Sequence, residues 1–516
     1  MNDIVFKSNS NIGDISAEQD KEFLDKCFIK TNDYEDIINF NNKKMIILGR
    51  TGVGKTAILQ ELKKTTDIYI SINPEEFSLE YINSIDFILR LKSLGVNLDI
   101  FYKFMWLHVI VSNIIKEYCK FFDESSFISQ LEKIGERRKI KDLKKYIEDN
   151  RSCLFESEIP YGPIEKELTK NLSASLGNNI LKTEGALQEK EVKKVQTLTN
   201  EYINRNQIKQ LHGVVDALSE EFNSNKQKKI AVVIDNLDTN WAGDDLAVKY
   251  KLINALLTVV REFDKFETLK VCIGVRADIW KQTCETQNRQ NEKDKSFLVN
   301  LSWTRGNLID LVSSRIKFLF EHKYQSKKDV TFYDIFPKKV DGFDGIDYII
   351  NRTMMRPRDA ISFVNRCISQ AEGTSKVSEL NVKNAEDLFL QDRYDALEHE
   401  WSEIYPSVKK YIVAIRKLSK KFTYKEIIKN FKDIESVILN TNNFKDKILK
   451  VFLDSKDKEE KVQTFLKALY VMGVVATVSK NGNLVFSNID KIELSELDFE
   501  DDAVFEIHPL FSKNNN

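Results

Sequence analysis

The chain has 516 residues, of which 42% are hydrophobic and 30% are charged, and its formal net charge is −1. This length allows two to four domains, and the balanced charge excludes a protein that is basic throughout, although not one with local basic patches. The six cysteines form no Cys-x-x-Cys pair and the five histidines show no metal-ligand spacing. We therefore expect reduced thiols in a cytoplasmic protein, with no zinc site.

The first residues, MNDIVFKSNSNIGD, do not have the basic start and apolar core of a secretory signal. The most membrane-like stretch, residues 98–115, contains Lys103 and His108. Charge at the centre of a bilayer is costly, so we predict a buried helix here and no association with a membrane.

Residues 1–77 are predicted to hold a polar lead with one helix, followed by the first half of a nucleotide-binding core. The apolar run Met45–Leu48 precedes GRTGVGKT, which matches the Walker A pattern between a strand and a helix. The glycines allow backbone N–H groups to curl around a phosphate, and the helix adds its positive N-terminal end. Lys55 is expected to reach the β- and γ-phosphates, and the Thr56 hydroxyl to bind Mg²⁺. The predicted ATP-binding residues of this loop are Gly49, Arg50, Thr51, Gly52, Val53, Gly54, Lys55, Thr56 and Ala57.

Residues 78–228 alternate charged and apolar residues at helical spacing with few turns, which predicts a long helical insertion. Its residues 189–222 fit either an extended helix or a hairpin, and we take their charges to form a solvated face.

The second half of the core is predicted at residues 229–302. The buried strand Ala231–Ile234 ends at Asp235, which we predict to be the Walker B acid that holds Mg²⁺ through water. Many P-loop ATPases have a second acid next, to orient the attacking water, but here the residue is Asn236, which cannot accept a proton. Asp238 is the nearest alternative, although it also fits a helix or turn cap. If neither residue serves, the protein binds ATP well and hydrolyses it slowly.

Lys55 and Asp235 are 180 positions apart, so the insertion lies inside the nucleotide domain. A second apolar run, LKVCIGV, ends at Arg276. Such short buried strands alternating with helices predict an α/β fold with a parallel sheet. Arg276 fits a sensor of the γ-phosphate, and its alternative role is an ion pair with Asp278.

Residues 303–404 are predicted to form a helical lid. Pro357 fits the first turn of a helix that begins beside Arg358. From that position Arg358 can swing onto the phosphates and couple the nucleotide state to the domain angle. Arg356 is the second candidate for this role, and a pair between Arg356 and Asp359 is the structural alternative.

Residues 405–516 are predicted to form a winged-helix-like module with a tail, because helices precede a hairpin that turns at Asn481-Gly482. Nine lysines and arginines but one acid, Glu426, lie between Lys409 and Lys432. Such a face fits duplex DNA or a protein partner equally well. If it binds DNA, neutralising Lys417, Lys420 and Lys421 removes the affinity.

Five motifs in this order resemble a family of bacterial P-loop ATPases related to the AAA+ and STAND classes: GRTGVGKT, VVIDNLDTNW, GVRADIW, LSWTRGNLIDLVSSRI and MMRPRDAISFV. The terminal EIHPLF is also typical of that family. The resemblance implies ATP with Mg²⁺, a core with a helical lid, and homo-oligomers in the nucleotide-bound state. It also implies the roles given above for Lys55, Thr56, Asp235, Arg276 and Arg358, and Asn236 is a departure from it. Such ATPases often occur in anti-phage defence, where their assembly controls an effector protein.

The resulting hypothesis is an ATP-binding, slowly hydrolysing molecular switch that controls a partner. One alternative is an initiator- or loader-type ATPase that closes on duplex DNA. Another is a scaffold that binds nucleotide for structure alone.

Overall fold

The computed structural model describes residues 5–74, 98–122, 137–149, 170, 189–202, 209–224, 228–238 and 246–512, except for positions 288, 290, 327–328, 403, 442, 444, 488–490 and 492. The chain forms two compact units. One contains Thr31–Arg50 and Lys55–Leu301, and we call it the sheet unit. The other contains Met1–Lys30, Thr51–Gly54 and Ser302–Asn516, and we call it the helical unit. The N-terminal lead, which we had grouped with the nucleotide-binding core, therefore belongs with the predicted lid.

The sheet unit is built on five parallel strands in the order β2-β3-β4-β1-β5. The strands are β1 (Ile46–Gly49), β2 (Ile68–Ile72), β3 (Ile230–Ile234), β4 (Leu269–Arg276) and β5 (Leu298–Asn300). All residues of β1 and β3 are buried, as apolar runs in a covered parallel sheet should be. Strand β4 lies between the strand before the Walker A loop and the strand before Asp235. This is the predicted α/β core of a P-loop NTPase, with a parallel sheet and the Walker A loop between β1 and α3.

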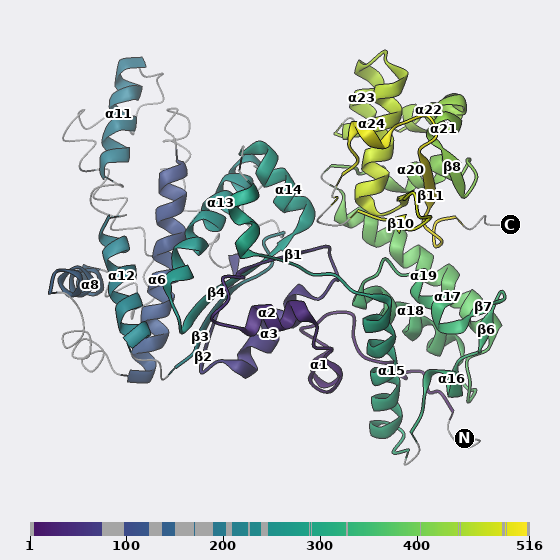
Figure 1. The fold of residues 1–516 in the computed structure, drawn as a ribbon, viewed down its shortest axis with the longest axis horizontal. Coiled ribbons are helices and arrows are strands. Elements are labelled where there is room, and N and C mark those ends of the chain that lie inside the picture. Colours follow the sequence, from purple (N-terminus) through teal and green to yellow (C-terminus); the bar gives the residue numbers. More distant parts are fainter. Residues whose placement is uncertain are drawn as a thin grey trace. The chain divides into compact units, whose positions relative to one another are not determined.

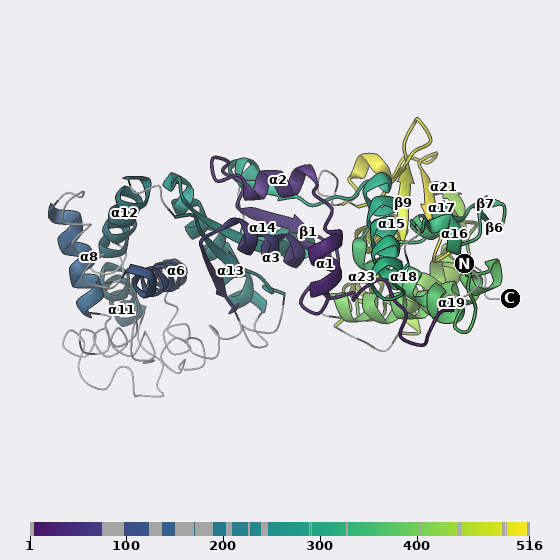
Figure 2. The same cartoon turned by 90° about the horizontal axis from the view of Figure 1, so that it is seen from below.

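Helices lie on both sides of this sheet, with α2 and α3 on one side and α13 and α14 on the other (Figures 1 and 2). The regular helices of the unit are α2 (Asn32–Ile38), α3 (Lys55–Thr65), α6 (Asp99–Phe122), α8 (Arg137–Asp149), α11 (Glu189–Tyr202), α12 (Lys209–Ser224), α13 (Leu246–Val260) and α14 (Ala277–Thr286), with the 3₁₀ helices η2 (Arg261–Lys265) and η3 (Asn291–Phe297).

A buried lysine fastens α2 to the sheet. Lys270 of β4 is 1% exposed, and its Nζ donates to the carbonyl oxygens of Asp36, Ile37 and Asn39 at 2.8–3.2 Å. These carbonyls stand at the C-terminal end of α2, where a helix leaves such groups without partners and attracts positive charge.

The predicted insertion is helical where it is described, in α6, α8, α11 and α12. Residues 75–97, 123–136, 150–169, 171–188, 203–208 and 225–227 lie outside the described part. The choice between one extended helix and a hairpin for residues 189–222 depends on residues in those gaps and stays open. The membrane-like stretch lies in α6, where Trp106, Ile110 and Ile114 are fully buried. In the described parts of the chain, no helix has the length and apolar character to cross a membrane.

The N-terminal lead packs into the helical unit. Ile12 is fully buried, its N–H donates to Asn365 Oδ1, and Arg315 donates to its carbonyl oxygen. Arg315 also forms a buried ion pair with Asp20 at 2.5 Å. The helices around this lead are α1 (Lys21–Cys27), α15 (Arg305–His322), α16 (Phe332–Ile335), α17 (Gly345–Ile350), α18 (Pro357–Gln370) and α19 (Glu379–Glu400), with a hairpin of β6 (Lys339–Val340) and β7 (Phe343–Asp344).

The C-terminal module has winged-helix-like content. It contains α20 (Val408–Ile415), α21 (Tyr424–Lys429), α22 (Phe431–Leu439), α23 (Lys447–Asp454), α24 (Lys458–Met472) and the 3₁₀ helix η4 (Glu496–Asp498), with β8 (Lys421–Thr423), β9 (Val475–Val478), β10 (Leu484–Val485) and β11 (Val504–Ile507). Strands β9 and β10 form the predicted hairpin, in which Gly482 has a φ of 80°. The antiparallel sheet order is β10-β9-β11-β8.

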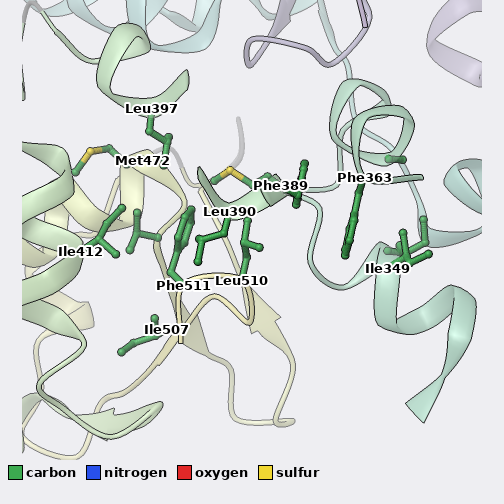
Figure 3. Close-up of a cluster of buried hydrophobic side chains, with 14 of the residues drawn as sticks. Ile349, Phe363, Phe389, Leu390, Leu397, Ile412, Met472, Ile507, Leu510 and Phe511 are labelled. Atoms are coloured by element: carbon green, nitrogen blue, oxygen red, sulfur yellow. The ribbon is translucent and has the colours of Figure 1, made fainter. Parts of the chain in front are cut away.

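The C-terminal module and the predicted lid share one hydrophobic core (Figure 3). Leu510 and Phe511 of the terminal EIHPLF lie beside Leu390 of α19 in this cluster (Figure 3). His508 accepts from Leu510 N at Nδ1, so its Nε2–H donates to the carbonyl oxygen of Thr353, 3.1 Å away. The motif therefore joins the two parts, and a displacement of the lid carries the module with it.

We predict that a buried histidine makes the sheet unit sensitive to acid. His108 of α6 is 1% exposed, its Nδ1 and the Tyr146 hydroxyl of α8 form a hydrogen bond of 2.8 Å, and burial lowers the pKa of His108 from 6.5 to about 4. Between these two pKa values, His108 is protonated in the unfolded chain and neutral in the folded chain. The free energy of unfolding therefore falls as the pH falls. The loss from this residue between pH 7 and 4.5 should be about 2 to 3 kcal/mol.

Urea unfolding of His108→Gln at the two pH values tests this, with the exposed His399→Gln as control. The His108 variant should lose less stability on acidification than the wild type, and an equal loss would contradict the prediction.

Candidate functional site

The Walker A loop joins the buried end of β1 to the first residue of α3. Lys55 begins α3, and its Nζ donates to the carbonyl oxygens of Gly49 and Arg50, each at 3.1 Å. The ammonium group therefore lies inside the curve of the loop. Burial lowers the pKa of Lys55, and the carboxylates of Asp235 and Asp238 oppose that shift. A desolvated cation in this place gains strongly from an anionic ligand.

The predicted metal ligands meet on the sheet unit. Thr56 Oγ1 donates to Asp235 Oδ2 at 2.7 Å. Asp235 follows the last residue of β3, and in parallel strands such positions gather at one edge of the sheet. Burial raises the pKa of Asp235, while hydrogen bonds from Thr56 and from the Asn236 backbone oppose that shift. A hydroxyl beside a carboxylate is an oxygen donor set suited to Mg²⁺ held together with phosphate oxygens, so the residues fit the ion.

A glycine in the neighbouring strand makes room for this carboxylate. Gly274 of β4 pairs with Ile47 of β1, and a Cβ atom added to it would lie 2.5 Å from Asp235 Oδ1. Any side chain at position 274 would therefore force this carboxylate to shift. We did not predict this role, although an isolated glycine inside an apolar strand often marks such a close approach.

The backbone at position 236 explains why an asparagine is tolerated there. Asn236 has a φ of 59°, in the left-handed region, and asparagine adopts this conformation more readily than glutamate does. The side chain is exposed. Asn thus replaces the usual second acid at a position whose left-handed backbone is favourable for Asn and strained for Glu.

Arg276 is held by two carboxylates. Its Nε and Nη2 donate to the two oxygens of Asp278 at 3.0 and 2.8 Å, and its Nη1 to Asp238 Oδ2 at 3.3 Å. The alternative of an ion pair with Asp278 is thus present in the structure. The sensing role of Arg276 and the water-orienting role of Asp238 both stay predictions, and each requires this cluster to open.

The tip of the loop, Thr51–Gly54, belongs to the helical unit. Arg356 Nη1 donates to the carbonyl oxygen of Thr51 at 2.8 Å. The backbone N–H of Arg358 donates to the carbonyl oxygen of Gly52 at 3.4 Å. Trp303 Nε1 donates to the carbonyl oxygen of Val53 at 2.8 Å. Trp303 lies in a motif that we recognised, but we had given it no role. Its contact joins residues 250 positions apart, which no local pattern reveals.

The side chain of Arg358 lies against Gly52. A Cβ atom at position 52 would stand 2.9 Å from Arg358 Cβ, and the φ of Gly52 is 78°. Arg358 Nε donates to the carbonyl oxygen of Ile15 in the N-terminal lead at 3.3 Å. Arg358 is thus placed at the Walker A loop, as predicted for a lid arginine, whereas its contact with a phosphate stays a prediction.

Arg356 sits in a buried charge cluster. It is 3% exposed and bonds to Asp359 at 2.9 Å, which is the predicted structural alternative. Asp359 also pairs with Arg393 at 3.2 Å. Burial acts to raise the pKa of Asp359, but the charges of Arg356 and Arg393 outweigh it and lower that pKa to about 2. Arg356 therefore contacts the loop backbone through a fixed guanidinium group.

Comparisons with known proteins give a family match within the helical unit and lower similarities over most of the chain. Residues 306–398, which cover most of the segment from α15 to α19, match the family described as the FunZ-associated C-terminal helical domain. The chain is 22% identical over 526 residues to the 80.3 kDa protein attributed to transposon gamma-delta in Escherichia coli (strain K12), covering 98% of this chain and 67% of that protein. The crystal structure of Cdc6p from Pyrobaculum aerophilum matches with 13% identity and a TM-score of 0.26, over 90% of this chain and 84% of that one. That score is too low to support a shared fold, so the fold class rests on the sheet order and the loop.

We predict that Gly274→Ala weakens Mg²⁺-dependent ATP binding by roughly tenfold or more, because it moves the carboxylate that orients the metal. The matched control is Gly306→Ala in α15, where an added Cβ meets its nearest atom at 3.7 Å, an ordinary contact. Titrations with Mg²⁺ and with EDTA measure the effect. An unchanged Mg²⁺ dependence in Gly274→Ala would show that the clearance at position 274 does not set the position of Asp235 in the metal site.

Proposed function

We propose that this protein is an ATP-binding molecular switch of the AAA+/STAND kind, in which Mg²⁺ and ATP at the Walker A loop set the state of the C-terminal module. The observation that carries the proposal is the grouping of Lys55, Thr56 and Asp235 beside a loop whose tip belongs to the helical unit. Bound Mg²⁺ would neutralise phosphate charge, with Thr56 and Asp235 as its protein ligands.

The proposal extends to assembly and to a partner. The core shared between the lid and the C-terminal module supports transmission from the loop tip to the module. Following the family resemblance, we propose that the ATP-bound chain forms homo-oligomers that engage an effector protein, in the setting of anti-phage defence. We further propose slow turnover, since Asn236 cannot act as a base and Asp238 is engaged by Arg276.

We predict that Lys55→Ala abolishes ATP binding and any ATP-dependent change in sedimentation, because it removes the cation inside the loop. Lys63→Ala, an exposed lysine of the same helix, is the matched control. Analytical ultracentrifugation with and without Mg·ATP gives the readout. A Lys55 variant that assembles in ATP as the wild type does would refute the switch. So would a wild type whose thermal stability follows ATP while its assembly never does, because that behaviour defines a scaffold.

A second function, binding of duplex DNA by the C-terminal module, is supported by four exposed lysines in one short stretch of the chain. Lys421 lies in β8, Lys425 and Lys429 lie one turn apart in α21, and Lys432 lies at the start of α22; the described residues provide no ion-pair partner for them. Such cations suit the phosphate backbone of a nucleic acid.

Two lysines of the earlier set are engaged within the chain. Lys417 donates to the carbonyl oxygen of Asp433, and Lys420 pairs with Glu506 at 3.3 Å. The better DNA-binding candidates are therefore Lys421, Lys425 and Lys429.

We predict that, if the module binds duplex DNA, changing these three lysines to alanine removes most of the affinity and lowers the slope of log K against log salt by about 3. The control changes three exposed lysines elsewhere in the helical unit, Lys323, Lys338 and Lys376, so that net charge is matched. Fluorescence anisotropy over a salt series measures both quantities. Equal losses in the two triple variants would exclude this face as the DNA site.

A further inference from the structure

Three successive carbonyl groups of the Walker A loop accept hydrogen bonds from the helical unit. The donors are the Arg356 guanidinium group for Thr51, the Arg358 backbone for Gly52 and the Trp303 indole for Val53. They come from two separate segments, the one before α15 and the start of α18. The loop tip is thus fixed by its carbonyl side.

This arrangement also determines where the amide groups point. In a planar trans peptide, the C=O of one residue and the N–H of the next point in opposite directions. Because the carbonyls of Thr51, Gly52 and Val53 face the donors, the N–H groups of Gly52, Val53 and Gly54 face away from them. Positive φ values of 78° at Gly52 and 101° at Gly54 let the chain turn so that these N–H groups form an anion-binding nest.

We propose that Trp303 and Arg356 are positioning residues of the phosphate site, which hold the loop tip in the conformation that presents these N–H groups to a phosphate chain. The proposal rests on the proposed function, because it assumes that the loop binds the phosphates of ATP. It assigns to Trp303 a role in ligand binding without contact with the ligand.

The two donors are themselves held in place. Arg356 is fixed by Asp359, which Arg393 also binds. Trp303 is half-buried and packs against the hydrophobic core of the helical unit, and Val53, its acceptor, is 5% exposed. Donors that are already ordered lose little conformational entropy when they bind, so their hydrogen bonds act on the loop.

The test uses the full chain and two probes, Mg·ATP and Mg·tripolyphosphate. Trp303→Phe removes the indole N–H and keeps an aromatic ring. Loss of this hydrogen bond should lower the affinity for both probes by the same factor, roughly three- to tenfold. The reason is that the substitution affects the part of the site that binds phosphate. Trp401→Phe is the matched control, since the buried indole N–H of Trp401 has no acceptor among the described residues. It should leave both affinities unchanged.

Arg356→Lys provides a second variant that does not depend on Trp303. Its control is Arg366→Lys on the same helix, where the guanidinium group binds Asp392 at 2.8 and 2.9 Å and makes no hydrogen bond to the loop in the described part of the chain. Arg356→Lys should weaken both probes, and Arg366→Lys neither.

The outcomes separate this inference from the proposed function. Equal affinities in wild type, Trp303→Phe and Arg356→Lys would overturn the positioning role while leaving the switch intact. A lower affinity for ATP with an unchanged affinity for tripolyphosphate would also overturn the positioning role. The substitution would then act on a part of the site outside the phosphate-binding nest. A wild type that binds neither probe would overturn both the proposed function and this assignment.

Discussion

The hydrogen bonds to the carbonyl groups of Thr51, Gly52 and Val53 are the constraint on which the account depends. The flanking residues Arg50 and Lys55 belong to the sheet unit, whereas these carbonyls are bound by donors of the helical unit. Within eight residues the chain passes from one unit to the other and back. In the proposed function, a phosphate group bound at this loop would contact a segment whose residues are divided between the two units. Such a ligand shifts the state of a larger element only through its different affinities for the two states.

The C-terminal module follows from the same constraint. It shares a buried core with the lid helices, and the terminal EIHPLF closes that core through Leu510, Phe511 and the His508 contact to Thr353. Packed interiors move as units rather than deform continuously. Under the proposed function, a nucleotide-dependent displacement of the loop tip would therefore move the lid and the C-terminal module together.

The sequence predicted the parts of the site that local patterns determine. The Walker A loop and Asp235 each follow a buried strand, so their position at one sheet edge could be inferred, as could the glycine turn of the hairpin. The remaining features depend on contacts between distant segments. Sequence spacing alone does not predict contacts between residues that are far apart in the chain. Such contacts place the N-terminal lead, direct the Trp303 indole to Val53 and bring Gly274 next to Asp235. The sequence shows Asn at position 236 where the family resemblance implies an acid, but the left-handed backbone there, which favours Asn, is seen only in the structure.

The most direct test is amide hydrogen exchange of the full chain with and without Mg·ATP, followed by mass spectrometry. If nucleotide binding is transmitted through the loop, exchange becomes slower in peptides that contain residues 52–56 and also in peptides from the start of α18 and from residues 303–310, which bind the loop tip. Protection confined to residues 52–56 and the strands of the sheet unit, with no change in the helical unit, would contradict the claim that nucleotide binding is transmitted through the loop.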